Sequence, residues 1–199
     1  MLTESMEDMR ARHARSVRLT VDVVARVRPD QLDAETPCIG WRLRDLLEHM
    51  TAQNHGFAAA ARGGDDPGVW AVRTSADPVA AYLASADDVV AAFAAQDVFE
   101  RSLAFPEAPG HPVPATQAIG FHLVDSVVHA WDVARSIGET VTPDPAVAEA
   151  ALNIALAVPD GPERSAPGSV FAPALSVPEQ SSTLDRILLL LGRSPNWPS

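Results

Sequence analysis

The sequence predicts a mainly α-helical protein. Apolar residues recur every three or four positions over long stretches, which is the period of an α-helix with one buried face. Prolines and glycines gather between these stretches, where turns are expected. Only two short segments, 98–103 and 169–172, suggest strands.

The periodicity and its interruptions define six helices in order. Pro29 ends the first helix, Asp77 and Pro78 suit the start of the third, and Gly138 tolerates the left-handed conformation just past the fourth. Repeated prolines in residues 158–180 exclude a long regular element, so we expect a loop wrapped within one domain that spans residues 1–199. The predicted helices cover residues 3–28, 41–62, 77–96, 115–138, 146–157 and 182–191.

Composition limits the classes of function. A chain of 199 residues with 47% hydrophobic and 21% charged residues is typical of a soluble globular protein. The net charge of −11 argues against nucleic acid and anionic membranes as partners. The single cysteine, Cys38, cannot form an internal disulfide, and the N-terminus lacks a hydrophobic signal core. No apolar run reaches the roughly 18 residues of a membrane span, so we expect a cytoplasmic protein.

The fourth predicted helix carries the groups best suited to bind a metal ion. Asp125 and His129 are four residues apart, which stacks them about 6 Å apart along the helix axis. His122 offers a second pairing with Asp125, but it lies roughly 10 Å from His129. One ion can therefore be shared by either pair, and a third ligand must come from elsewhere.

His49, at the edge of the second predicted helix, is the best third ligand. Three protein ligands and one open position are typical of catalytic zinc, and imidazole with carboxylate also suits nickel, iron(II) or manganese. From spacing alone, histidines hydrogen-bonded to acids in the core are the simpler interpretation. Asp132 is expected to orient a histidine or to pair with an arginine. Arg135 could pair with Asp132 or with a neighbour of Asp125, or bind an acidic substrate, and we favour an ion pair. Cys38 is expected to be a small buried apolar residue.

Two segments resemble a known family. Residues 36–49, Thr-Pro-Cys-Ile-Gly-Trp-Arg-Leu-Arg-Asp-Leu-Leu-Glu-His, look like the first metal-ligand segment of the DinB-like superfamily. They are more closely similar to the N-terminal, metal-binding domain of mycothiol-dependent maleylpyruvate isomerase. Asp125-Ser-Val-Val-His129-Ala-Trp-Asp resembles that family's second segment, an acid followed four residues later by His and then by Trp-Asp. The tail from Phe171 to Trp197 resembles an uncharacterised, actinobacterial-type subgroup.

The resemblance implies a fold and a ligand set. The expected fold is a DinB-like four-helix bundle with extra short helices and a small β-hairpin. One divalent ion, with zinc as the first candidate, would be held by His49, Asp125 and His129. The family has Glu where this chain has Asp125, which is one methylene shorter and would bring the ion closer to the helix. His122 then becomes a pocket residue and the candidate acid/base group.

The resemblance also implies a chemistry. A low-molecular-weight thiol, mycothiol in the family, would bind the ion, which lowers the thiol pKa and yields thiolate at neutral pH. The expected activity is therefore that of a metal-dependent thiol transferase or thiol-dependent isomerase on a small electrophile. Two alternatives stay open: a hydrolase that uses metal-bound water, and a non-catalytic bundle that binds a metal or ligand. The expected partners are the thiol and a small-molecule substrate, and a homodimer is also left open.

Overall fold

The computed structural model describes residues 5–106, 110–166 and 169–198. Within them are six α-helices, four short 3-10 helices and one small sheet. The α-helices are α1 (Met6–Val24), α2 (Leu43–Ala61), α3 (Pro78–Phe93), α4 (Ala115–Ser136), α5 (Pro145–Ala157) and α6 (Thr183–Leu190). The 3-10 helices are Pro29–Gln31, Pro67–Trp70, Val98–Glu100 and Pro162–Ser165. Strands β1 (Ser102–Leu103) and β2 (Val113–Pro114) pair antiparallel.

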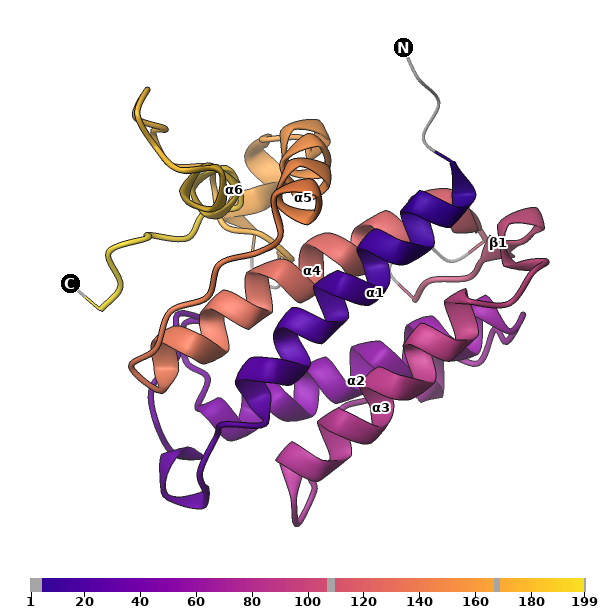
Figure 1. The fold of residues 1–199 in the computed structure, drawn as a ribbon, viewed down its shortest axis with the longest axis horizontal. Helices are drawn as coiled ribbons and strands as arrows, with labels where there is room; N and C mark the ends of the chain where they lie inside the picture. The colour runs from indigo at the N-terminus through magenta and orange to yellow at the C-terminus, as the bar shows by residue number, and fades with distance from the viewer. Residues whose placement is uncertain (1–4, 107–109, 167–168, 199) are drawn as a thin grey trace.

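Helices α1 to α4 form a bundle, with α5 and α6 attached to one side of it (Figure 1). Helix α1 packs along α4, and α2 packs along α3. Helices α5 and α6 pack against each other, and α5 also contacts α4. The arrangement confirms the predicted mainly α-helical fold, with its four-helix bundle, extra short helices and β-hairpin.

Local sequence explains where the helices begin and end. Ser5 caps α1, Asp77 caps α3 and Ser182 caps α6, each by accepting a hydrogen bond from a backbone N–H three residues later. Gly138 follows α4 with a φ of 76°, a conformation that costs glycine little. The helices predicted to end at residues 28 and 96 end earlier, at Val24 and Phe93, because apolar spacing continues past the last intrahelical hydrogen bond. Residues 3 and 4, where the first helix was predicted to begin, lie outside the described residues.

Helix α4 contributes to all three apolar clusters of the protein. Ala130 and Val133 join the cluster between α1 and α2, Ile119 joins that around α3 and the hairpin, and Val127 joins that under α5 and α6. All four side chains are fully buried. Burial of a Val or Ile side chain contributes about 1.5–3 kcal/mol, so α4 is held from three sides. A helix packed in this way is a rigid support for functional side chains.

Two predictions about strands need correction. Residues 98–103 were expected to form one strand, but Val98–Glu100 is a 3-10 helix and only Ser102–Leu103 is extended. The partner strand, Val113–Pro114, was not predicted from the sequence.

The strand predicted at residues 169–172 is wrong, because these residues have no regular structure. The buried side chain of Arg164 organises this proline-rich part of the chain instead. Its guanidinium donates hydrogen bonds to the carbonyl oxygens of Val158 (3.2 Å), Pro159 (2.8 Å) and Leu190 (2.7 Å). Side-chain donors therefore satisfy backbone groups that a strand ladder would otherwise pair.

No helix in the described parts of the chain combines the length and apolar character needed to cross a bilayer.

Candidate metal centre

The imidazole of His129 lies between two carboxylates of its own helix. Its Nε2 is 3.2 Å from Oδ1 of Asp125, one turn earlier, and its Nδ1 is 2.8 Å from Oδ2 of Asp132, three residues later. Asp132 has no exposed surface, whereas the side chain of Asp125 is 34% exposed. Asp132 therefore fixes the ring from the buried side, and Nε2 faces the more open side.

Helix α2 brings His49 to the same place. The ring centroids of His49 and His129 are 5.6 Å apart, with the planes nearly perpendicular. The ring of Trp41, just before α2, lies 4.8 Å from that of His49 and is 37% exposed. Trp41 therefore covers the outer side of His49. The three ligands predicted from sequence thus surround one region between α2 and α4.

Burial and mutual charge set the protonation states of these three groups. Burial lowers the pKa of His49 to about 4, and the nearby charge of His129 adds to this effect, so His49 is neutral at pH 7 and offers a lone pair. Burial opposes ionisation of Asp125, but the positive charge of His129 and the hydrogen bond to it bring the pKa of Asp125 well below its usual range. Burial likewise opposes protonation of His129, but Asp125 and Asp132 together raise its pKa well above the usual value. The imidazolium of His129 is the positive charge beside the anionic Asp125.

Asp132 is also the acceptor for two groups from distant parts of the chain. Nε of Arg193 lies 3.1 and 3.2 Å from its two oxygens, and Sγ of Cys38 lies 3.4 Å from Oδ2. An Nη of Arg193 also approaches Sγ of Cys38 at 3.8 Å. Arg193 follows α6 and Cys38 precedes α2, so Asp132 links three segments. The sequence suggested both roles for Asp132, but its partner is Arg193 and not Arg135.

A second set of potential ligands lies behind His129. One ligand atom each from Cys38, His129 and Asp132 fall within 4.8 Å of one another, the one such close group found in the described residues. The set His49, Asp125 and His129 is more widely spaced by this measure. We nevertheless favour the wider set, because Arg193 already neutralises Asp132 and would repel a cation bound there. The wider set has no arginine paired to its carboxylate in the described residues.

His122 takes part in a buried hydrogen-bonded chain through the bundle. Its Nδ1 lies 2.8 Å from Nε2 of His13 on α1, and its Nε2 lies 2.9 Å from Oδ1 of Asn54 on α2. The amide of Asn54 donates to the hydroxyl of Ser85 on α3 (2.9 Å). Both ring nitrogens of His122 are therefore engaged, and the side chain is 1% exposed. The acid/base role expected of His122 stays a prediction.

The contact of Arg193 with Asp132 and the polar contacts of Cys38 were not predicted from the sequence. Cys38 is half-buried and polar in its contacts, whereas a purely apolar environment was expected. Arg135, for which an ion pair was expected, donates from its guanidinium to the carbonyl oxygen of Trp197. Arg193 is 61 residues from Asp132, so no local spacing could have indicated the pair. The Trp-Asp of the second motif was the one available signal for Asp132.

Comparison with known proteins identifies the family of the chain. Residues 13–134 match the family model described as the mycothiol maleylpyruvate isomerase N-terminal domain. This chain belongs to that family. The matched range contains His49, Asp125, His129 and Asp132, but it ends before Arg193. The family match therefore covers the three candidate ligands, whereas Arg193, which contacts Asp132, lies outside the matched range.

Two relatives are similar to this chain over most of its length. Two proteins from two strains of Mycobacterium tuberculosis, both described as uncharacterized, are each 31% identical to this chain over 188 residues. The alignment covers 92% of this chain and 96% of each relative. The similarity therefore extends past residue 134 and includes α5.

Solved structures establish the fold. The crystal structure of the mycothiol-dependent maleylpyruvate isomerase superposes with a TM-score of 0.57, and a histidine-to-alanine mutant of it with a TM-score of 0.60. Each comparison covers 75% of this chain and 68% of the isomerase chain, at 14% sequence identity. This likeness confirms the DinB-like helical fold expected from the two motifs.

Proposed function

We propose that this protein binds one divalent metal ion through His49, Asp125 and His129 and uses it to activate a low-molecular-weight thiol. The observation that carries the proposal is the hydrogen bond from Nδ1 of His129 to Asp132, at 2.8 Å. That bond fixes the tautomer in which Nε2 holds the free lone pair once the ring is neutral. Nε2 faces Asp125, and the ring of His49 lies beside it.

The donor set suits the proposed ion. Two imidazoles and one carboxylate form a three-ligand set that leaves a fourth position open, as in catalytic zinc sites. Nickel, iron(II) and manganese accept the same donors. When bound, such an ion supplies the positive charge that lowers the pKa of a coordinated thiol, so that the thiol is present as thiolate at neutral pH.

Residues of the chain prepare the site for this role. His49 is neutral at pH 7, so it needs no proton removed before it can donate its lone pair. Asp132 and Arg193 hold His129 from behind, which prevents the ring from turning away. Trp41 shields one side of His49 from water. These contacts support a preorganised site that opens towards Asp125.

The family supports the choice of thiol. The family model and the two isomerase structures are described as mycothiol-dependent or as mycothiol maleylpyruvate isomerase. We therefore propose mycothiol as the thiol and a small electrophile as its acceptor, in thiol transfer or thiol-dependent isomerisation. His122 is the proposed acid/base group, with His13 as its proton partner.

A spectroscopic experiment tests the proposal directly. Protein reconstituted with cobalt(II) is titrated with mycothiol, and the thiolate-to-cobalt charge-transfer band is recorded. We expect the band to appear in the original protein and to be absent in His49→Ala. Turnover is then measured with maleylpyruvate and with a chlorinated aromatic acceptor, with and without thiol. The proposal fails if no band forms, or if an ester or amide is hydrolysed without thiol while no thiol-dependent product appears.

A further inference from the structure

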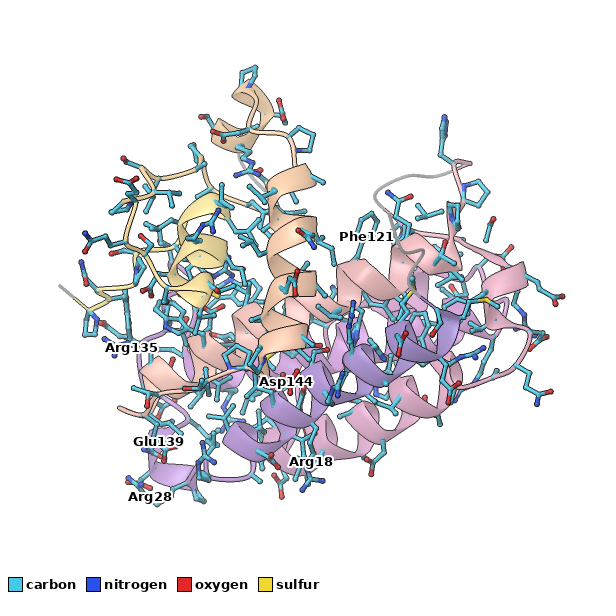
Figure 2. All side chains as sticks on the ribbon, turned by 45° about the horizontal axis from the view of Figure 1, so that its top comes forward. Arg18, Arg28, Phe121, Arg135, Glu139 and Asp144 are labelled. Atoms are coloured by element: carbon cyan, nitrogen blue, oxygen red, sulfur yellow. The ribbon has the colours of Figure 1, made fainter. Side chains whose placement is uncertain are left out.

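The metal centre opens towards the N-terminal half of α4. Residues 126–134 of this helix are all buried, whereas Gln117, Phe121 and Asp125, at intervals of four residues, form an exposed stripe that ends at the centre. Phe121 is 38% exposed and lies one turn before Asp125, about 6 Å along the helix axis. Figure 2 shows Phe121 towards one end of α4 and Arg135 towards the other. A ligand that extends from the centre along the exposed stripe therefore meets Phe121.

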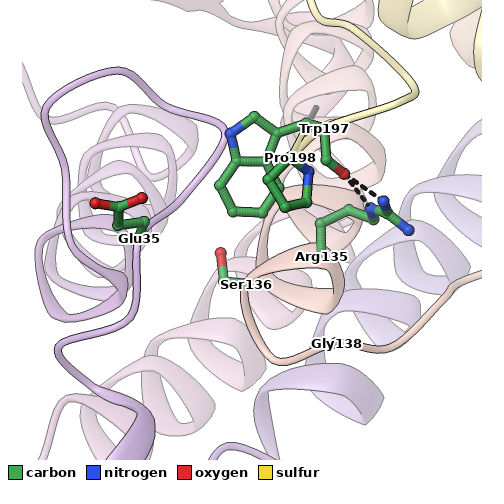
Figure 3. A pocket seen from close by; sticks show the side chains of 6 residues that line it. All are labelled: Glu35, Arg135, Ser136, Gly138, Trp197 and Pro198. Atoms are coloured by element: carbon green, nitrogen blue, oxygen red, sulfur yellow. Dashed lines mark hydrogen bonds between the residues drawn. The ribbon is translucent and has the colours of Figure 1, made fainter.

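The cavity near the other end of α4 does not serve the centre. It has a volume of about 500 Å³ and lies between Glu35 and Trp197 (Figure 3). It shares no lining residue with the three candidate ligands. The buried side chain of Asp132, with the groups bound to it, separates this cavity from Nε2 of His129. A second substrate must therefore be held on the side of Asp125.

Three further aromatic rings gather beside Phe121. The ring centroid of Phe105 lies 6.4 Å from that of Phe121 and 5.4 Å from that of Trp70. Phe57 of α2 is buried and lies 5.1 Å from Trp70. A Cβ at Gly56 would overlap the indole of Trp70, so glycine lets this ring lie directly on α2. We call Trp70, Phe105 and Phe121, which are all partly exposed, the aromatic wall.

The aromatic wall lies at one end of the metal centre. His49 lies beside His129, and Phe57 lies beside His122, so α2 and α4 run antiparallel past the centre. Phe57 follows His49 by eight residues, about 12 Å along the helix axis. The wall is thus about 6–12 Å from the ligand side chains. One end of a small molecule can contact the wall while its other end reaches the ion.

The helix segments between the wall and the ligands contain no acidic or basic residues other than histidine. Residues 50–61 of α2 and 115–124 of α4 include no Asp, Glu, Lys or Arg. These segments therefore offer no guanidinium to pair with a carboxylate. The first charged side chain along α4 is the carboxylate of Asp125, which repels an anion. An uncharged flat ring suits the wall, because aromatic rings attract one another in stacked and edge-to-face arrangements.

We infer that the aromatic wall binds the electrophilic acceptor, and that this acceptor is an uncharged molecule with an aromatic ring. The inference rests on the proposed function, because it assigns the second substrate of the same reaction. The thiol loses its proton to solvent, and its sulfur forms a bond to the electrophilic carbon. For a chlorinated ring, the carbon–chlorine bond breaks and chloride leaves with the electron pair. Phe121, next to Asp125, determines the specificity, and an anionic acceptor such as maleylpyruvate should be a poor substrate.

A binding experiment tests the wall separately from the chemistry. 1,3-Dinitrobenzene, an uncharged ring without a leaving group, is titrated into the full-length protein, and quenching of tryptophan fluorescence is recorded. We expect Phe121→Ala to bind it about tenfold more weakly and Phe121→Leu, which keeps apolar bulk without the ring, to be intermediate. Phe171→Ala is the matched control, because Phe171 packs on Arg164 in the proline-rich segment, and it should bind like the original protein. Circular dichroism confirms that each variant is folded.

A second pair of measurements separates the wall from the proposed function. 3,5-Dinitrobenzoate adds a carboxylate to the same ring, and we expect the original protein to bind it about fivefold more weakly than dinitrobenzene. Turnover is then measured with mycothiol and 1-chloro-2,4-dinitrobenzene. Absent binding of dinitrobenzene, equal binding by Phe121→Ala, or tighter binding of the benzoate overturns the inference, whether or not the thiol reacts. If the ring binds as expected but no thiol-dependent product forms, the aromatic wall stands and the proposed metal-thiol function is wrong.

Discussion

Replacing Asp132 by Asn should weaken metal binding and destabilise the fold at once. Asp132 is fully buried and accepts from His129 Nδ1 at 2.8 Å, from Arg193 Nε at 3.1 Å and from Cys38 Sγ at 3.4 Å. Burial opposes its ionisation, but Arg193 and His129 lower its pKa, so it is an anion at neutral pH. Asn keeps the shape but removes the charge and can turn an N–H₂ donor towards Arg193.

The expected magnitudes follow from these contacts. Removing one partner of a buried ion pair costs about 3–5 kcal/mol. We expect a loss near the lower end, because the amide oxygen retains one hydrogen bond and the side chain of Arg193 is 15% exposed. Loss of the group that orients a ligand histidine typically lowers metal affinity about 10–100-fold.

Urea denaturation in the presence of a chelator measures the first effect, and competition with a chromogenic chelator measures the second. Asp88→Asn is the matched control, because Asp88 also pairs with an arginine, Arg62 at 2.6 Å, but both side chains are about half exposed. That pair should contribute only about 0–1 kcal/mol, with no effect on metal affinity. The reasoning is refuted if Asp132→Asn matches Asp88→Asn in both measurements.

Two further predictions concern the histidine chain and the second set of ligands. Burial lowers the pKa of His13, and the charge of His122 adds to this effect. Burial also lowers the pKa of His122 to about 4. Below the pKa of an unfolded histidine, near 6.5, the unfolded chain therefore binds protons that the native state does not bind. The free energy of unfolding should fall as pH drops below about 6.5, by about 1.4 kcal/mol per pH unit for each histidine. His13→Gln should be less stable than the original protein at pH 7.5 but should lose less stability on acidification. Urea midpoints are measured at pH 7.5, 6 and 5, and an equal decrease in both proteins would contradict this prediction. Cys38→Ser should retain the metal with affinity within about threefold of the original, since hydroxyl replaces thiol beside Asp132 and not at the ion; loss of the metal in equilibrium dialysis would favour the set of Cys38, His129 and Asp132 instead.

The fold was largely predictable because its determinants are local. The helix starts at Asp77 and Ser182 and the helix end at Gly138 depend on caps and glycine conformation within a few residues. The strands were less predictable, because a two-residue strand such as Ser102–Leu103 is defined by its partner and not by its own pattern. Residues 169–172 have a strand-like composition, but they have no neighbouring strand as a partner. The side chain of Arg164 instead donates hydrogen bonds to backbone carbonyl oxygens of the surrounding segments, such as that of Leu190.

The candidate site was predictable only as far as helical spacing and the two motifs reach. The stacking of Asp125 and His129 follows from their separation by four residues. The environment of Cys38 and the contact of Arg193 with Asp132 depend on how the tail returns across α4, which no pattern in the tail encodes. The engagement of His122 by His13 likewise joins residues 109 positions apart. Such contacts are consequences of tertiary packing.

Metal content tests the central claim most directly. Four proteins are loaded with zinc, dialysed and analysed by elemental mass spectrometry: the original protein, His49→Ala, His129→Ala and His55→Ala. His55→Ala is the control, because it alters an exposed histidine on the same helix as His49. We predict one zinc per chain in the original protein and in His55→Ala, and almost none in His49→Ala and His129→Ala. Zinc retained by His49→Ala at the level of the original protein would contradict the proposed centre.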